Sequence, residues 1–194
     1  MPNNDDAWPE LEVTKLDAAR RQLETSIWLL FEGRDAVSVR TLAHAAFGIL
    51  KDVSNHRNER SVLDAANEIA ASSPGFWNGF NRVGNFLKHA DKDPTGVLSG
   101  VPEEENEALI SIAIELYRNL GCIVTPEIES FYLWSRSIHF QSIDDVCEPF
   151  ISWLNRNADR LHSDRRQELL DIGRELLVNL KDHGHDIGQR NCDG

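Results

Sequence analysis

The residues best suited to chemistry lie close together in the middle of the chain. Arg82, Asn85 and His89 follow one another at steps of three and four residues, so a helix places them on one face. An arginine can hold a phosphate group through two parallel hydrogen bonds, and a histidine near a helix C-terminus is favoured in the cationic form that acts as a general acid. The spacing therefore predicts a candidate catalytic stripe of Arg82, Asn85 and His89 that suits phosphate chemistry.

Further polar residues surround this stripe and are candidates for binding. They are Asn78, Asn81, Lys88, Asp91 and Asp93. Asparagine is a weak helix former, so three asparagines in one helix carry a local cost that functional or interface sites commonly explain. Two other interpretations stay open, namely a solvated helix face and asparagines that fill a polar contact between helices.

His89, Asp91 and Asp93 alternate where this helix should end. Imidazole and carboxylate groups can ligate Zn²⁺, Mn²⁺ or Mg²⁺, which makes a metal-binding helical protein an alternative. Side-chain turns that lead into Pro94 explain the two aspartates equally well. We therefore expect no metal and no cofactor, and we take the histidines and the cysteine near the C-terminus as incidental tail composition.

Two further arginine and histidine pairs occur. His44 lies on an Ala-rich helix face, where a core or edge histidine is expected, and Arg40 lies one turn before it, so that both could contribute to a site across a helix pair. Arg156 and His162 form the other pair, within a basic patch diluted by acidic residues. This patch is predicted to be the solvated junction of two helices.

Apolar residues recur at helical spacing along almost the whole chain. Helices are predicted near 15–32, over Val39–Val53, from Ser61 to before Pro74, over 76–90 and 103–120, from Pro126 through Trp134, near 143–160, and from Ser163 to about Leu180. Thr14 and Thr125 are predicted N-caps, with Pro126 at the first helical position, and Gly33 is a predicted stop signal. Pro149 is expected to bend or interrupt its helix.

No stretch alternates apolar and polar residues for long enough to predict a sheet. The expected fold class is therefore all-α, a single helical bundle of about seven or eight helices over residues 14–182. An acidic N-terminal tail over 1–13 and a flexible C-terminal tail over 183–194 flank it. The first two long helices should pack antiparallel, with the 76–90 helix against them.

The composition limits the partners and the cellular location that we expect. The 194 residues are 41% hydrophobic, enough for a sizeable core, and carry a net charge of -12, which argues against a broad basic surface for nucleic acid but allows a local basic pocket. No apolar run approaches the length of a membrane span, and the first ten residues show no apolar segment of a signal peptide. Three widely spaced cysteines suggest reduced thiols, so we expect a cytoplasmic protein with no membrane partner.

The motif N-F-L-K-H-A-D-K-D-P at 85–94 resembles the signature of a family of uncharacterised bacterial helical proteins. Segments S-V-R-T-L-A-H-A-A at 38–46 and F-Y-L-W-S-R-S-I-H at 131–139 resemble other parts of that family. The resemblance covers roughly residues 19 to 140. It implies a helical fold and a bacterial cytoplasmic setting, and it implies no reaction.

A weaker resemblance is to HEPN domains, helical bundles of which many act as metal-independent ribonucleases through an arginine, four to six intervening residues and a histidine. Arg82 and His89 are separated by six residues and match this pattern. Arg156 and His162 match it too, with Asn157 directly after the arginine. The resemblance implies that His89 would be the acid and base and Arg82 the phosphate clamp, in a dimer that brings two pairs together.

The leading interpretation is a protein that acts through association, most simply as a homodimer, with the polar Asn/Arg/His helix face as its functional surface. A different protein is a possible partner for the same face. The alternative is a HEPN-type ribonuclease, and RNA is a partner only under that alternative.

Overall fold

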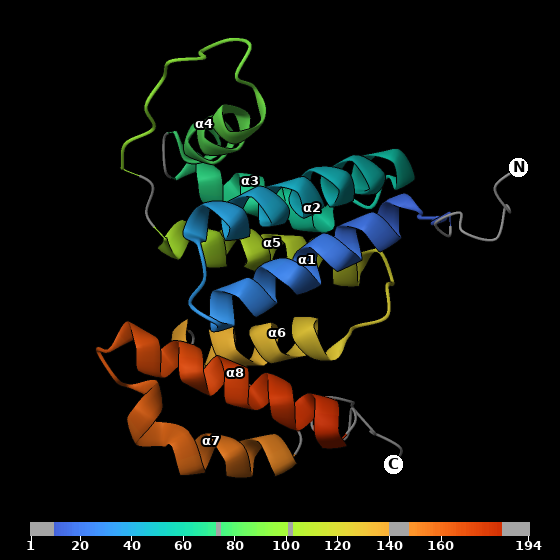
Figure 1. Ribbon diagram of the computed structural model, residues 1–194. Helices are drawn as coiled ribbons and strands as arrows, with labels where there is room; N and C mark the ends of the chain where they lie inside the picture. The colour runs from blue at the N-terminus through green and yellow to red at the C-terminus, as the bar shows by residue number, and fades with distance from the viewer. Residues whose placement is uncertain (1–9, 73–74, 101–102, 140–147, 184–194) are drawn as a thin grey trace, which may run out of the picture.

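The computed structural model describes residues 10–72, 75–100, 103–139 and 148–183 (Figure 1). These residues form eight helices and no strand, which confirms the all-α class. The helices are α1 (Lys15–Phe31), α2 (Ala36–Arg57), α3 (Ser61–Ala71), α4 (Phe76–Lys88), α5 (Glu104–Asn119), α6 (Pro126–His139), α7 (Glu148–Leu161) and α8 (Arg166–His183). The predicted tails fall largely outside the described residues.

Helix α1 begins and ends where its caps predict, whereas α2 is longer than the predicted Val39–Val53 and runs from Ala36 to Arg57. Thr14 accepts a hydrogen bond from the backbone of Asp17, whose carboxylate accepts one from the backbone of Thr14, a complete capping box. Gly33 follows α1 in the left-handed region, at φ 59°, and donates to the carbonyl of Leu30. Asp35 then caps α2, and the short link makes α1 and α2 antiparallel neighbours, as expected (Figure 1).

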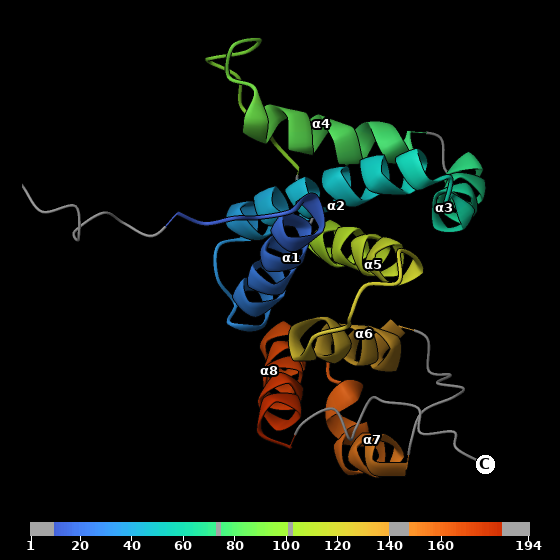
Figure 2. The ribbon, with the colours of Figure 1, turned by 90° about the vertical axis from the view of Figure 1, so that its right-hand side faces the viewer.

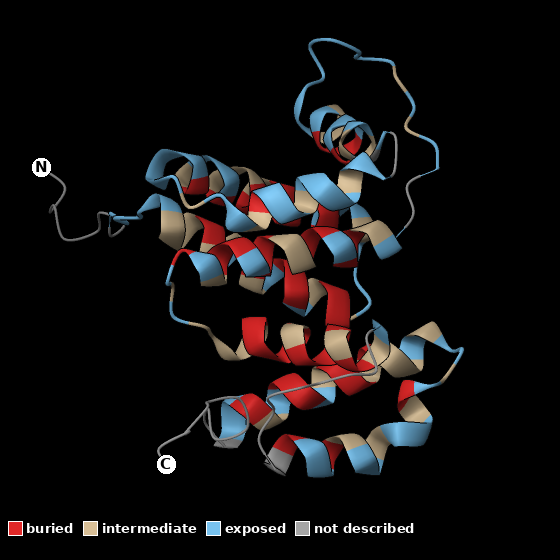
Figure 3. Ribbon diagram, turned by 180° about the vertical axis from the view of Figure 1, so that it is seen from behind, coloured by how far each residue is buried: buried red, intermediate tan, exposed pale blue. Residues whose placement is uncertain are grey.

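The core lies where the helices face one another. α1 packs along α2, α2 packs on α5, and α6 packs on α8, while α1 also contacts α6 and α8 (Figure 2). Fully buried aromatic residues occupy this junction: Phe31 stacks on Phe131 and meets Trp134 edge-on, and the indole of Trp134 donates to the carbonyl of Leu169 at 2.7 Å. Buried residues accordingly line the inward sides of these helices (Figure 3).

Some predicted helix ends are wrong. Pro149 does not interrupt α7, because the helix begins at Glu148 and proline is tolerated in a first turn. The predicted start of this helix, near residue 143, lies outside the described residues. Helix α8 begins at Arg166, later than predicted, because the Ser163 hydroxyl accepts from the backbone of Arg165 in a turn before the helix. Pro126 begins α6 as expected, but the Thr125 hydroxyl has no hydrogen-bond partner among the described residues.

Helix α4 lies at the edge of the molecule, against the side of α2 that faces away from α1 (Figure 2). Trp77 near its start contacts Phe47, and Gly84 and Lys88 near its end contact His44, so α4 runs antiparallel to α2. Helix α3 connects the two and packs on α5. Within the described residues, no helix has both the length and the apolar character that crossing a membrane requires.

Candidate functional site

Helix α4 has one apolar and one polar face, as the sequence predicts. Phe80 and Val83 are buried against the body of the protein. The predicted site residues Asn78, Asn81, Arg82 and Asn85 are exposed. The side chains of Arg82 and Asn85 make no hydrogen bond or ion pair with the described residues, so their polar groups are available to a partner.

His89 does not extend the helix. The prediction of a helix to residue 90 is wrong, because α4 ends at Lys88 and His89 adopts φ -128° and ψ 80°. Its backbone N–H still donates to the carbonyl of Asn85 at 3.0 Å, which keeps His89 at the end of α4. The imidazole is half exposed, with Nδ1 3.9 Å from a carboxylate oxygen of Asp91. Arg82, Asn85 and His89 are thus all exposed to solvent. Only Arg82 and Asn85 lie within α4, and His89 lies directly after its last residue.

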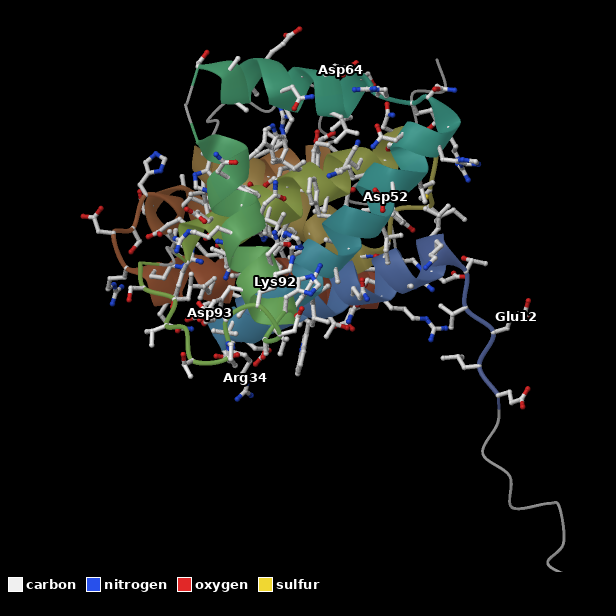
Figure 4. All side chains as sticks on the ribbon, turned by 90° about the horizontal axis from the view of Figure 1, so that it is seen from above. Glu12, Arg34, Asp52, Asp64, Lys92 and Asp93 are labelled. Atoms are coloured by element: carbon white, nitrogen blue, oxygen red, sulfur yellow. The ribbon has the colours of Figure 1, made fainter. Side chains whose placement is uncertain are left out.

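The two aspartates belong to the exposed loop that follows α4, in which Figure 4 labels Asp93. The carboxylate of Asp93 folds back over Gly96, whose backbone N–H donates to the Asp93 carbonyl at 3.2 Å. No group of three metal-ligating side chains occurs within the part of the chain that the structure describes. His89, Asp91 and Asp93 therefore do not form the metal site considered as an alternative.

Lys88, a predicted binding residue, is exposed, but the end of its side chain reaches α2. Its ammonium Nζ lies 3.0 Å from Nδ1 of His44 on α2. Burial of the imidazole, together with the positive charges of Lys88, Arg40 and Lys51, lowers the pKa of His44 to about 4. His44 is therefore neutral and accepts from Lys88, and burial likewise lowers the pKa of the Lys88 ammonium.

Because Nδ1 of His44 accepts, its ring proton lies on Nε2. That atom is buried and has no hydrogen-bond partner within the described residues. The ring lies against α4 at Gly84, where an added Cβ would come within 2.0 Å of Nε2. Only a glycine lets the two helices approach this closely.

Arg40 completes this interior cluster. Its side chain is 1% exposed, and its Nη2 donates to a carboxylate oxygen of Glu105 on α5 at 2.6 Å. The guanidinium lies over the ring of Phe80, with 5.8 Å from its carbon to the ring centroid. The sequence suggested that Arg40 and His44 contribute together across a helix pair, and the structure brings both to the contact between α2 and α4. The signal in the sequence was the spacing of one helical turn between Arg40 and His44.

A cavity lies at the N-terminal end of α4, away from His44. This cavity of about 260 Å³ opens between α2, α3 and α4, and Asn81 is the predicted site residue that lines it. Lys51 and Arg60 supply positive charge, while Trp77 closes one side and donates from its indole to the Asn67 side chain at 2.9 Å. Sequence reasoning missed this cavity because its lining comes from three helices.

The second arginine and histidine pair lies elsewhere. Arg156 is exposed on α7, and His162 is exposed just after that helix ends. Neighbouring Arg160 forms two hydrogen bonds of 2.9 Å with Glu175 on α8. The basic patch is therefore partly neutralised by ion pairs between α7 and α8, as expected for a solvated junction.

Comparisons with protein-family models, with curated proteins and with solved structures found no match to this chain. The resemblances to the bacterial helical family and to HEPN domains accordingly stay predictions. Function has to be argued from the residues of α4 and their surroundings.

Proposed function

We propose that this protein acts by association, forming a homodimer through the outer face of α4. Asn78, Arg82, Asn85 and His89 constitute this surface, which we name the α4 face. The observation that carries the proposal is that these polar side chains are all exposed, on a helix at the edge of the molecule (Figure 2). Exposed asparagines in a helix lower its intrinsic stability, so a partner offers a reason for them.

The order of residues on the α4 face suits pairing with itself. In a twofold dimer the same patch meets itself, so residue i contacts residue j and j contacts i. An antiparallel pairing about the middle of α4 puts Arg82 of one copy opposite Asn85 of the other, and Asn78 opposite His89. The Arg82 guanidinium and the His89 imidazole then each face an amide, which both donates and accepts hydrogen bonds, and the two arginines do not meet. One polar helix face buries less area than a stable interface needs, so the dimer should be weak, with a dissociation constant in the micromolar range.

The test uses charge at residue 85. Asn85→Lys would place a second cation opposite Arg82 twice per dimer, whereas Asn85→Asp would place an anion there. We expect the dissociation constant to rise about tenfold with lysine and to fall several-fold with aspartate, since exposed ion pairs each contribute about 0.2–1 kcal/mol. Sedimentation velocity over a concentration series measures both shifts.

Asn155→Lys, an equal change at an exposed position on α7, is the matched control and should leave the dissociation constant unchanged. A monomer at all micromolar concentrations would contradict the proposal. Equal effects of Asn85→Lys and Asn85→Asp would contradict the pairing with Arg82.

Ribonuclease activity is the second candidate, because both Arg82 and His89 are open to a bound phosphate and Arg82 has no anionic partner within the described residues. Under this candidate the purified protein cleaves single-stranded RNA in the presence of a metal chelator. Replacing either Arg82 or His89 with alanine should then lower the cleavage rate at least about a hundredfold, the usual size of an acid–base contribution. Cleavage that survives His89→Ala, or no cleavage at all, rejects this candidate.

A further inference from the structure

The cavity between α2, α3 and α4 has an apolar floor. Phe47 and Leu63 are buried there, and Trp77 covers one side. The rings of Trp77 and Phe47 stack with 5.9 Å between their centroids, and the Trp77 indole N–H donates to Asn67 Oδ1, so the tryptophan ring is held in place. A cavity of about 150 Å³ holds benzene, so about 260 Å³ leaves room for an aromatic ring with a small polar group, about ten non-hydrogen atoms in all.

The rim of the cavity is polar, and its side chains are accessible to a ligand. The exposed residues that line it are Lys51, Asn55, Arg60, Asn67 and Asn81. The side chains of Lys51, Asn55 and Asn81 form no hydrogen bond or ion pair with the described residues. Asn67 uses its carbonyl oxygen to accept from Trp77, and its amide nitrogen donates to none of the described residues. The rim therefore offers mainly hydrogen-bond donors, which an anionic ligand can use.

The cavity is positively charged, although the whole chain carries a net charge of -12. Lys51 and Arg60 line it, and no carboxylate of the described residues does. Arg60 has an anionic neighbour in Asp64, one turn along α3 and labelled in Figure 4, at 3.5 Å, but both side chains are more than half exposed. Such an exposed pair contributes little stability, so the guanidinium can turn to a bound anion at small cost. Two cations on one small cavity therefore favour an anion.

We infer that this cavity binds a small aromatic anion, a single ring that carries a carboxylate or a phosphate group. The ring packs on Phe47, Leu63 and Trp77, because aromatic rings gain from edge or stacked contacts beyond the area they bury. The acid group accepts hydrogen bonds from Lys51 and Arg60. An apolar floor with a few convergent polar groups is the usual composition of a small-molecule site. This inference goes beyond association, since no residue that lines the cavity belongs to the α4 face.

Four probes separate the contributions of the ring and the charge. Phenylacetate and phenyl phosphate have both, phenylacetamide lacks the negative charge, and acetate lacks the ring. In a ¹⁵N–¹H titration of the full chain, we expect saturable shifts of the Trp77 indole resonance with phenylacetate and phenyl phosphate. Phenylacetamide should bind at least about threefold more weakly than phenylacetate, and acetate at least about tenfold more weakly because it buries no ring. Tighter binding of phenyl phosphate than of phenylacetate would identify a phosphate ester as the ligand class, and the reverse order a carboxylate.

Charge reversal tests the role of the cations. Lys51→Glu replaces a cation of the rim with an anion and should weaken phenylacetate binding about fivefold or more. Lys15→Glu is the matched control, because Lys15 is exposed at the start of α1, does not line the cavity, and changes the net charge of the chain by the same amount. It should leave phenylacetate binding unchanged.

A bulky residue on the rim tests the location. Asn55→Trp should fill the cavity and abolish the saturable shifts, and the protein should stay folded because Asn55 is exposed and its side chain forms no hydrogen bond with the described residues. His56→Trp changes the next residue of α2, which is also exposed but does not line the cavity. This control should bind phenylacetate normally.

The inference fails if neither phenylacetate nor phenyl phosphate gives saturable shifts. Equal binding of phenylacetamide and phenylacetate would contradict the recognition of an anion, and equal effects of Lys51→Glu and Lys15→Glu would contradict the contact with Lys51. Normal phenylacetate binding by both tryptophan variants would show that the ligand lies elsewhere. None of these outcomes depends on whether the protein dimerises through the α4 face.

Discussion

Gly84→Ala is expected to destabilise the protein by about 2–3 kcal/mol, near the upper end for an overpacked contact. The new methyl group would lie within 2.0–2.4 Å of three atoms of the His44 ring. The ring has little room to move, because it is buried and Lys88 holds its Nδ1. Alanine favours a helix over glycine by about 1 kcal/mol, but the clash outweighs this gain. Urea unfolding followed by circular dichroism gives the difference in free energy of unfolding.

Gly79→Ala is the matched control in the same helix. No atom lies within 4 Å of the Cβ that it would add, so only the gain in helix propensity remains. This variant should be stabilised by about 0.5–1 kcal/mol. Equal stability of the two variants would show that α4 does not pack on His44 as closely as described.

The free energy of unfolding should fall as the pH drops from about 6.5 toward about 4, and His44 should account for about 2 kcal/mol of this loss. The pKa of His44 is about 4 in the folded protein and near 6.5 in the unfolded chain. Between these two pKa values His44 is protonated in the unfolded chain but not in the folded protein, so a lower pH favours unfolding. Above pH 6.5 both states are neutral at this residue, and its contribution is constant.

The chain has seven histidines and many carboxylates, so the contribution of His44 has to be isolated by a variant. In His44→Gln, whose amide can still accept from Lys88, the loss between about pH 7 and about pH 4.5 should be smaller by about 2 kcal/mol. His56→Gln, an exposed position on the same helix, should keep the full pH dependence of the natural protein. Equal slopes for all three proteins would mean that folding does not lower the pKa of His44.

The helices were predictable because each depends on residues near in sequence. The capping box of Thr14 and Asp17, the left-handed Gly33 and the proline that begins α6 act within a few residues, and they confirm the predicted positions. The prediction of helix ends was wrong where a helical pattern is followed by residues that favour a loop. His89 was predicted inside a helix, but the chain leaves the helix there to enter the loop toward Pro94. The order of apolar residues also predicted which side of α4 is buried.

The amphipathic period of α4 determined that Arg82 and Asn85 face solvent, since it requires only the spacing of Phe80 and Val83. It could not determine that the exposed Lys88 side chain ends on His44, because a long flexible side chain can extend in several directions. The tertiary structure decided this by bringing His44, 44 residues earlier, to 3.0 Å from Lys88. It likewise joined Arg40 to Glu105 and left two buried donors of Arg40 without a partner among the described residues. Such contacts depend on how helices distant in sequence pack, and the periodicity of one helix carries no information about the position of another.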